Sequence, residues 1–240
     1  MTRESKELSV GADRFLALEW ANQAFELYVS TRDMLLARDF LQVYLETQID
    51  GKESRRKTYN QLNRLWLSDK DATAPLRSGI LSFANIPFDI PLSVLHLGLA
   101  INVFPIYAET VQVVGTLARI MDSVPVNAII DRVIERFSNP TSIPRAVTRV
   151  LQTLNNWGFI ETQESKVKTL HMELVNEDLV SWYILAMLFS NPQSETTLQE
   201  LDNNPFKLGI NFLHPRKAIG NSNDLTLARN FQGLEVIRKK

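Results

Sequence analysis

Residues 143–172 read IPRAVTRVLQTLNNWGFIETQESKVKTLHM. Over 143–156 the apolar residues return every three to four positions, which predicts a helix, and Gly158 supplies the left-handed conformation that commonly follows a helix end. From residue 159 the spacing changes to alternation, with a polar turn at 163–166 between two runs of β-forming residues. The stretch therefore predicts a helix followed directly by a β-hairpin.

Two further helices are predicted just before this stretch. Apolar residues at helical spacing indicate helices at about 106–121 and 125–138. The turn Asn-Pro-Thr-Ser at 139–142 then offers an N-cap to the next helix. The order helix, helix, turn, helix, hairpin is that of a winged helix-turn-helix, in which the third helix enters the major groove of DNA.

The helix at 143–156 has two chemically distinct faces. In a projection of about 100° per residue, Val150, Leu151 and Leu154 lie within about 60° of Val147. The opposite side holds four polar residues: Arg145, Arg149, Gln152 and Asn156. Their side chains carry the donors that read base edges or bind phosphates. We therefore expect these four residues to contact DNA.

The predicted hairpin adds two lysines to this face. Lys166 and Lys168 are two residues apart, so they share one face of a strand, and a wing of this kind lies over the phosphate backbone, where ammonium groups add sequence-independent affinity. Glu161 and Glu164 weaken the local positive field. Winged helices also bind proteins and form dimers. A winged-helix adaptor that binds a protein partner without contacting DNA is therefore the alternative.

A second helix-turn-helix pattern lies near the N-terminus. Helices are predicted at 12–30, 33–48 and 53–67, and Asp50-Gly51 forms the turn before the third. The third helix places its basic residues away from its apolar stripe: Arg55, Arg56, Lys57 and Arg64. We predict a second DNA contact here, although such a run is equally typical of a solvated helix face.

Proline positions divide the rest of the chain. Pro75 predicts a loop over the polar segment 68–75, and Pro87 and Pro91 forbid a regular helix between the two halves. We predict a helical domain over 1–86 and a winged-helix domain over 87–240. The second domain carries an extension that has further helices, at about 91–102 and 177–190, and a strand at about 225–237. The predicted fold is mainly α with a small β-hairpin wing.

Composition excludes several classes of function. The chain has 240 residues, no cysteine and a formal net charge of −1. The lack of cysteine excludes disulfide scaffolds and thiol catalysis, and the charge argues against a protein that is basic over its whole surface. No phosphate-binding, nucleophile-elbow or zinc-protease motif is present. His96, His171 and His214 are widely spaced, and His96 lies in an apolar run that predicts a core position. We expect no catalysis, no cofactor and no metal.

The sequence favours a cytoplasmic location and no membrane contact. The first residues are charged and include no apolar signal segment. The longest apolar stretches, at 92–104 and 179–189, are shorter than the roughly 20 residues that span a bilayer. We expect both to be buried core helices.

Three segments carry a family resemblance: SRRKTYNQLNRLW at 54–66, LHLGLAINVFPIYAETV at 95–111 and PRAVTRVLQTLNNWGFI at 144–160. With the two helix-turn-helix units, they resemble the small BrxA component of bacterial BREX phage-defence systems. The resemblance implies a double-winged-helix protein that binds double-stranded DNA without catalysis, beside larger ATPase and methyltransferase partners. It implies DNA contacts at seven residues: Arg55, Arg56, Arg64, Arg145, Arg149, Lys166 and Lys168.

Overall fold

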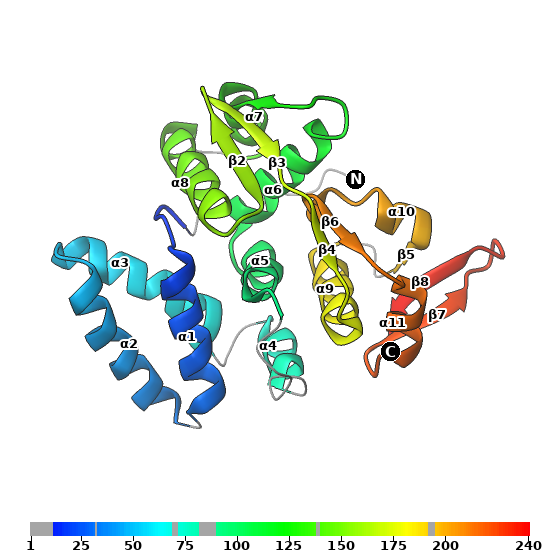
Figure 1. The fold of residues 1–240 in the computed structure, drawn as a ribbon, viewed down its shortest axis with the longest axis horizontal. Coiled ribbons are helices and arrows are strands. Elements are labelled where there is room, and N and C mark those ends of the chain that lie inside the picture. Colours follow the sequence, from blue (N-terminus) through cyan, green and yellow to red (C-terminus); the bar gives the residue numbers. More distant parts are fainter. Residues whose placement is uncertain (1–11, 32, 69–71, 82–89, 138–139, 192–194) are drawn as a thin grey trace, which may run out of the picture.

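The computed structural model describes residues 12–31, 33–68, 72–81, 90–137, 140–191 and 195–240. These residues form a mainly helical fold with small sheets. The N-terminal helices lie on one side, α5 and α9 lie near the centre, and the last hairpin lies on the opposite side (Figure 1). The mainly α class that the sequence predicts is confirmed.

The N-terminal part is built from helices. Its elements are α1 (Leu18–Ser30), α2 (Met34–Gln48), α3 (Lys52–Leu62), the π-helical segment η1 (Asn63–Leu67) and α4 (Ala74–Leu81). Asp33 begins α2 by accepting hydrogen bonds from the backbone N–H groups of Leu35 and Leu36. The predicted helices at 33–48 and 53–67 are thus present, the second one ending in a π-helical turn.

Two predictions in this part are wrong. The helix predicted from residue 12 begins only at Leu18, because Leu16 uses its backbone groups in hydrogen bonds to the distant Thr153 and Trp157. The loop predicted at 68–75 is wrong only at its end: the described residues 68, 72 and 73 lie outside helices, whereas Ala74 and Pro75 form the first turn of α4, a helix that was not predicted. Proline is tolerated there because the first N–H groups of a helix have no partner within that helix.

In the described residues, the centre of the chain contains four α-helices, one 3-10 turn and the three strands of a small sheet. These elements are α5 (Leu92–Val103), α6 (Pro105–Leu117), β1 (Val124–Pro125), α7 (Val126–Ile134), the 3-10 turn η2 (Pro140–Ser142), α8 (Ile143–Asn156), β2 (Ile160–Gln163) and β3 (Lys166–Thr169). The sheet has the order β1-β3-β2 and is antiparallel, with Val167 opposite both Val124 and Thr162. The helix at 143–156 and the hairpin after it are confirmed. The strand β1 was not predicted.

Local geometry explains the path from α8 into the hairpin. Gly158 adopts a φ of 81°, as the glycine after a helix end commonly does. Glu164 and Ser165 both have positive φ, which is the requirement of a tight two-residue hairpin turn. The Ser165 carbonyl accepts a hydrogen bond of 2.9 Å from the N–H of Val126, so the turn is fixed to the start of α7.

The C-terminal part alternates short strands and helices. Its elements are β4 (Met172–Leu174), α9 (Glu177–Ser190), β5 (Glu195–Thr197), α10 (Leu198–Asp202), the 3-10 turn η3 (Pro205–Lys207), β6 (Ile210–Phe212), α11 (Pro215–Asn221), β7 (Leu225–Arg229) and β8 (Glu235–Lys239). β4 pairs with β6 in parallel, and β5-β8-β7 form an antiparallel sheet. The single strand predicted at 225–237 is therefore a hairpin of two strands.

A buried cluster of aromatic rings connects η1, α5 and the end of α8. The Trp66 indole N–H donates a hydrogen bond of 3.1 Å to His96 Nδ1, and His96 Nε2 lies 2.8 Å from the Asn22 amide oxygen. The His96 ring lies 5.4 Å from Trp66 and 5.5 Å from Trp157. Burial lowers the pKa of His96 to about 3. The prediction that His96 is a core residue is confirmed.

The buried core is continuous across the predicted domain boundary. Residues of α1 and η1 belong to the same hydrophobic cluster as residues of α5, α8 and α9. Pro87 lies outside the described residues, and Pro91 caps α5. The division at residue 86 stays a prediction, whereas the packing holds both halves in one core.

Helix length bears on membrane contact. Among the described helices, no single one is long and apolar enough to cross a bilayer, and α5 with α6 passes such a test only as a pair bent by 114°. The predicted stretches at 92–104 and 179–189 correspond to α5 and α9, whose side chains are almost all buried.

Candidate nucleic-acid interface

Helix α8 separates its residues into a buried and an exposed side. The buried residues are Ile143, Ala146, Val147, Val150, Leu151, Thr153 and Leu154. Arg145, Thr148 and Gln152 are exposed and Arg149 is half-buried. We call these four residues the α8 face. The predicted division of the helix is confirmed, and Thr148 is an additional exposed polar residue that the sequence reasoning left out although its position follows from the same spacing.

The two arginines of the α8 face are held differently. Arg149 donates a hydrogen bond of 2.8 Å from Nη1 to the side-chain oxygen of Gln152. This neutral partner leaves the positive charge of Arg149 uncompensated and orients its guanidinium group. Arg145, near the start of the helix, has neither a hydrogen bond nor an ion pair to another described residue. Both charges are therefore available to an anionic ligand.

The β2–β3 hairpin presents the two predicted lysines beside α8. Lys166 and Lys168 are exposed, while Val167 between them is buried, so the lysines share the solvent-facing side of β3. Lys168 lies opposite Glu161 in the strand register. Neither lysine forms an ion pair within 4 Å to any other part of the described chain. Glu161 instead accepts a hydrogen bond from the Gln163 amide.

Asn156, at the last turn of α8, has an internal role. Its side-chain oxygen accepts a hydrogen bond of 2.7 Å from the N–H of Leu18, at the start of α1. One turn earlier, Thr153 Oγ1 accepts from the N–H of Leu16. The end of α8 therefore anchors the N-terminal segment, and the surface open to a ligand is limited to the first three turns of the helix.

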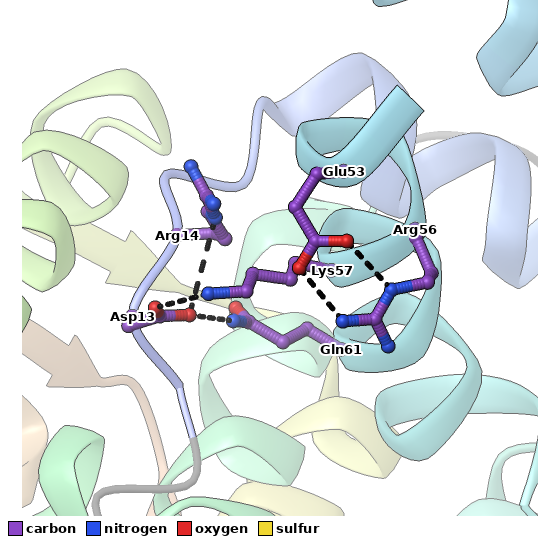
Figure 2. A network of polar contacts seen from close by, with 6 residues as sticks. All are labelled: Asp13, Arg14, Glu53, Arg56, Lys57 and Gln61. Carbon is purple, nitrogen blue, oxygen red and sulfur yellow. Dashed lines mark hydrogen bonds and ion pairs between the residues drawn. The ribbon is translucent and has the colours of Figure 1, made fainter. Parts of the chain in front are cut away.

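The other predicted basic residues lie on α3 and on η1 directly after it, and two of them, Arg56 and Lys57, are drawn with their acidic partners in Figure 2. Arg56 binds Glu53 through two hydrogen bonds, of 2.9 and 2.7 Å. These bonds lower the pKa of Glu53 and raise that of Arg56. Both groups are therefore charged near neutral pH, and their charges cancel locally.

A carboxylate from the N-terminal segment neutralises the next cation. Asp13 lies 3.5 Å from the Lys57 ammonium and also accepts a hydrogen bond of 3.2 Å from the Gln61 amide (Figure 2). Arg14 lies 4.0 Å from the same carboxylate. Asp13 is far from α3 in the sequence, so the helical pattern of α3 contains no indication of this contact.

Arg55 and Arg64 also have partners within the chain. Arg55 lies 3.8 Å from Glu46 and donates to the Ile49 carbonyl at 3.4 Å. Arg64 donates to the Val103 carbonyl at 3.3 Å, and its guanidinium group lies 5.0 Å from the centre of the Phe104 ring. We call Arg55, Arg56, Lys57 and Arg64 the α3 face. Three residues of the α3 face, Arg55, Arg56 and Lys57, are each paired with a carboxylate.

Comparison with known proteins adds no candidate. The chain matches no protein-family model, no curated protein and no solved structure. Within the described ranges, no group of three or more histidine, aspartate or glutamate side chains is placed to hold a metal ion. The geometry of the two basic faces is therefore the basis for a functional proposal.

Proposed function

We propose that this chain binds double-stranded DNA through a winged helix-turn-helix formed by α6, α7, α8 and the β1-β3-β2 sheet. Helix α8 enters the major groove, and the β2–β3 hairpin lies on the phosphate backbone. The single observation that carries the proposal is that four cations on α8 and on the hairpin that packs against it form no ion pair within the described chain: Arg145, Arg149, Lys166 and Lys168.

The chemistry of these side chains fits the two parts of a DNA surface. Arginine and glutamine in the major groove form paired hydrogen bonds with guanine and adenine edges. Lysines on the hairpin neutralise phosphates and release condensed counterions, which gives affinity that does not depend on sequence. A net charge of −1 over the whole chain is compatible with this mode because the positive charge needed is local.

We assign the α3 face a secondary role in DNA contact. Its residues from 55 to 57 would have to exchange a carboxylate for a phosphate, and the gain from that exchange is small because both partners carry similar charge. The resemblance to the BrxA family supports a non-catalytic role in phage defence, next to other defence-system proteins. That part of the proposal rests on the resemblance alone.

The test is a titration of a fluorescent random-sequence duplex of about 20 base pairs at two salt concentrations. The wild type is expected to bind, with an affinity that falls steeply as salt rises. The double variant Arg145→Glu, Arg149→Glu is expected to lose binding while keeping its circular dichroism spectrum and melting temperature. The matched control, Arg229→Glu with Lys240→Glu, makes the same charge change at exposed residues of the C-terminal hairpin and should bind like the wild type.

The result that contradicts the proposal is equal DNA binding by the Arg145→Glu, Arg149→Glu variant and the wild type. An absence of salt-dependent binding in the wild type would favour the alternative function, a winged-helix adaptor that binds a protein partner.

A further inference from the structure

Helix α2 carries a row of large apolar side chains on its solvent side. Leu36 is 45% exposed, Phe40 is 51% exposed and Val43 is 61% exposed. Residues spaced by four and three positions lie along one face of a helix, and this face points away from the buried residues Ala37, Leu41 and Leu45 of the same helix. Three adjacent large apolar residues exposed on one helix form a patch rather than scattered surface residues.

Acidic residues border this row on both sides. In a projection of about 100° per residue, Asp39 lies within about 40° of Val43 on one side, and Tyr44 lies within about 40° of Phe40 on the other. Glu19 and Glu26 are seven residues apart, so they share one exposed face of α1, which packs against α2. Partial burial raises the pKa of Tyr44, and the charges of these two carboxylates raise it further. The apolar row therefore runs between carboxylates of α1 and a carboxylate of α2.

The segment that forms α1 and α2 is negatively charged as a whole. Residues 18–50 contain six acids and two arginines, and one of the arginines, Arg38, binds the Asn63 side chain and the Leu67 carbonyl. Glu19, Glu26 and Asp39 are exposed and form no ion pair to the rest of the described chain. This face is thus apolar in the middle and negative at its edges.

We propose that the α1–α2 face binds a basic amphipathic helix of a partner protein. The apolar side chains of that helix cover Leu36, Phe40 and Val43, and its lysines or arginines meet Glu19, Glu26 and Asp39. An amphipathic helix recognised by an apolar strip with complementary charges at its edges is a recurring mode of protein recognition.

The edge charges also exclude other occupants. A second copy of this chain, related by a twofold axis, would bring the same patch against itself and so place acidic edges against acidic edges. Nucleic acid and anionic membranes are repelled by the same carboxylates. The proposal is separate from the DNA-binding one, because α2 and α8 are different surfaces of the molecule (Figure 1).

The test uses the full chain and a fluorescent synthetic helical peptide of about 18 residues, with leucine at helical spacing and lysine elsewhere. We expect saturable binding by fluorescence anisotropy, weakened at least tenfold in the variant Phe40→Ser, Val43→Ser. The matched control is Phe231→Ser with Leu234→Ser, two residues that are 95% and 52% exposed at the C-terminal hairpin. That control should bind within twofold of the wild type, and both variants should bind DNA like the wild type.

Charge is tested separately. The variant Glu26→Gln, Asp39→Asn is expected to bind the peptide at least threefold more weakly and with a shallower salt dependence. The proposal is overturned by equal binding of a scrambled leucine–lysine peptide or of a leucine–glutamate helix, and by equal losses in the two serine variants. It is also overturned if light scattering shows a dimer that Phe40→Ser, Val43→Ser converts to a monomer, since the occupant is then a second copy.

Discussion

Helices α3 and α8 each present basic residues on the side away from their apolar stripes, yet the two sets of residues differ in whether they have acidic partners within the chain. On α3, Arg56 and Lys57 are paired with Glu53 and Asp13. On α8, Arg145 has no partner in the described chain and Arg149 has a neutral one. A row of cations on a helix is therefore more available to an anionic ligand where no carboxylate of the same chain reaches it.

The difference is one of degree, because ion pairs at a protein surface are weak and screened by salt. A phosphate could replace Asp13 beside Lys57. The exchange returns little free energy, whereas a phosphate that meets Arg145 forms a new charge pair and releases counterions. The comparison predicts unequal contributions of the two faces to DNA binding, and the following experiments test that inequality.

The largest effect on DNA affinity is expected from neutralising the α8 face, and neutralising the α3 face serves as the comparison. Arg145→Gln with Arg149→Gln should weaken DNA binding about 100-fold, since each arginine that contacts a base edge contributes about 1–3 kcal/mol. Arg56→Gln with Lys57→Gln removes the same charge and should weaken binding less than about threefold. Titration of one duplex with both variants measures the ratio. Equal losses would show that the two faces contribute alike.

The second test concerns the buried aromatic cluster at His96, which contacts Trp66 after α3 and Trp157 after α8. It asks whether His96 stays uncharged in the folded chain. The pKa of His96 is about 3 in the folded chain and about 6.5 in an unfolded one. Between these values the unfolded chain binds one more proton, so lowering the pH below about 6.5 should reduce the free energy of unfolding by about 1.4 kcal/mol per pH unit.

The matched variant for that test is His96→Gln, which keeps one acceptor for Trp66 and one donor for Asn22. Chemical unfolding between pH 7 and 4.5 should show a shallower decline for this variant than for the wild type. Parallel curves would mean that His96 does not titrate differently in the two states.

A third, smaller effect is expected at the hairpin. Lys166→Ala with Lys168→Ala should weaken DNA binding about tenfold for every sequence, and should make the slope of log affinity against log salt shallower by about two, because two phosphate contacts are lost. Lys217→Ala with Lys240→Ala is the control of equal charge. A change in sequence preference, or an unchanged salt slope, would count against a backbone contact by the hairpin.

The smallest effect tests the α3 face by freeing its cations. Asp13→Asn with Glu53→Gln removes the carboxylates beside Lys57 and Arg56. DNA affinity should rise about threefold and the salt dependence should steepen, because the freed cations can bind phosphates. Glu173→Asn with Asp224→Asn adds the same charge at exposed residues elsewhere. If both variants raise the affinity equally, the effect is one of net charge and the α3 face has no direct contact.

Much of the helical framework could be predicted because it depends on local spacing. The apolar period places α2, α8 and α9 within a residue of their observed bounds, and the change of period at Gly158 places the β2–β3 hairpin. Elements that depend on distant partners were missed. The strand β1 forms because Val124 pairs with Val167, which is distant in the sequence. The strand β4 forms because it pairs with β6, which follows it in the sequence only after α9, β5 and α10.

For α3 and α8, the sequence by itself determined which residues turn toward solvent, since the helical period is local and burial of apolar side chains follows it there. On α2 the same rule fails, because Leu36, Phe40 and Val43 are exposed. It placed Arg145, Arg149 and the α3 cations on exposed sides. Only the tertiary structure decided which of these charges stay available, because the carboxylate beside Lys57 belongs to Asp13, in another segment of the chain. Electrostatic attraction depends on the distance between charges in space, and the spacing of residues along one helix does not predict the distance to a charge in another segment.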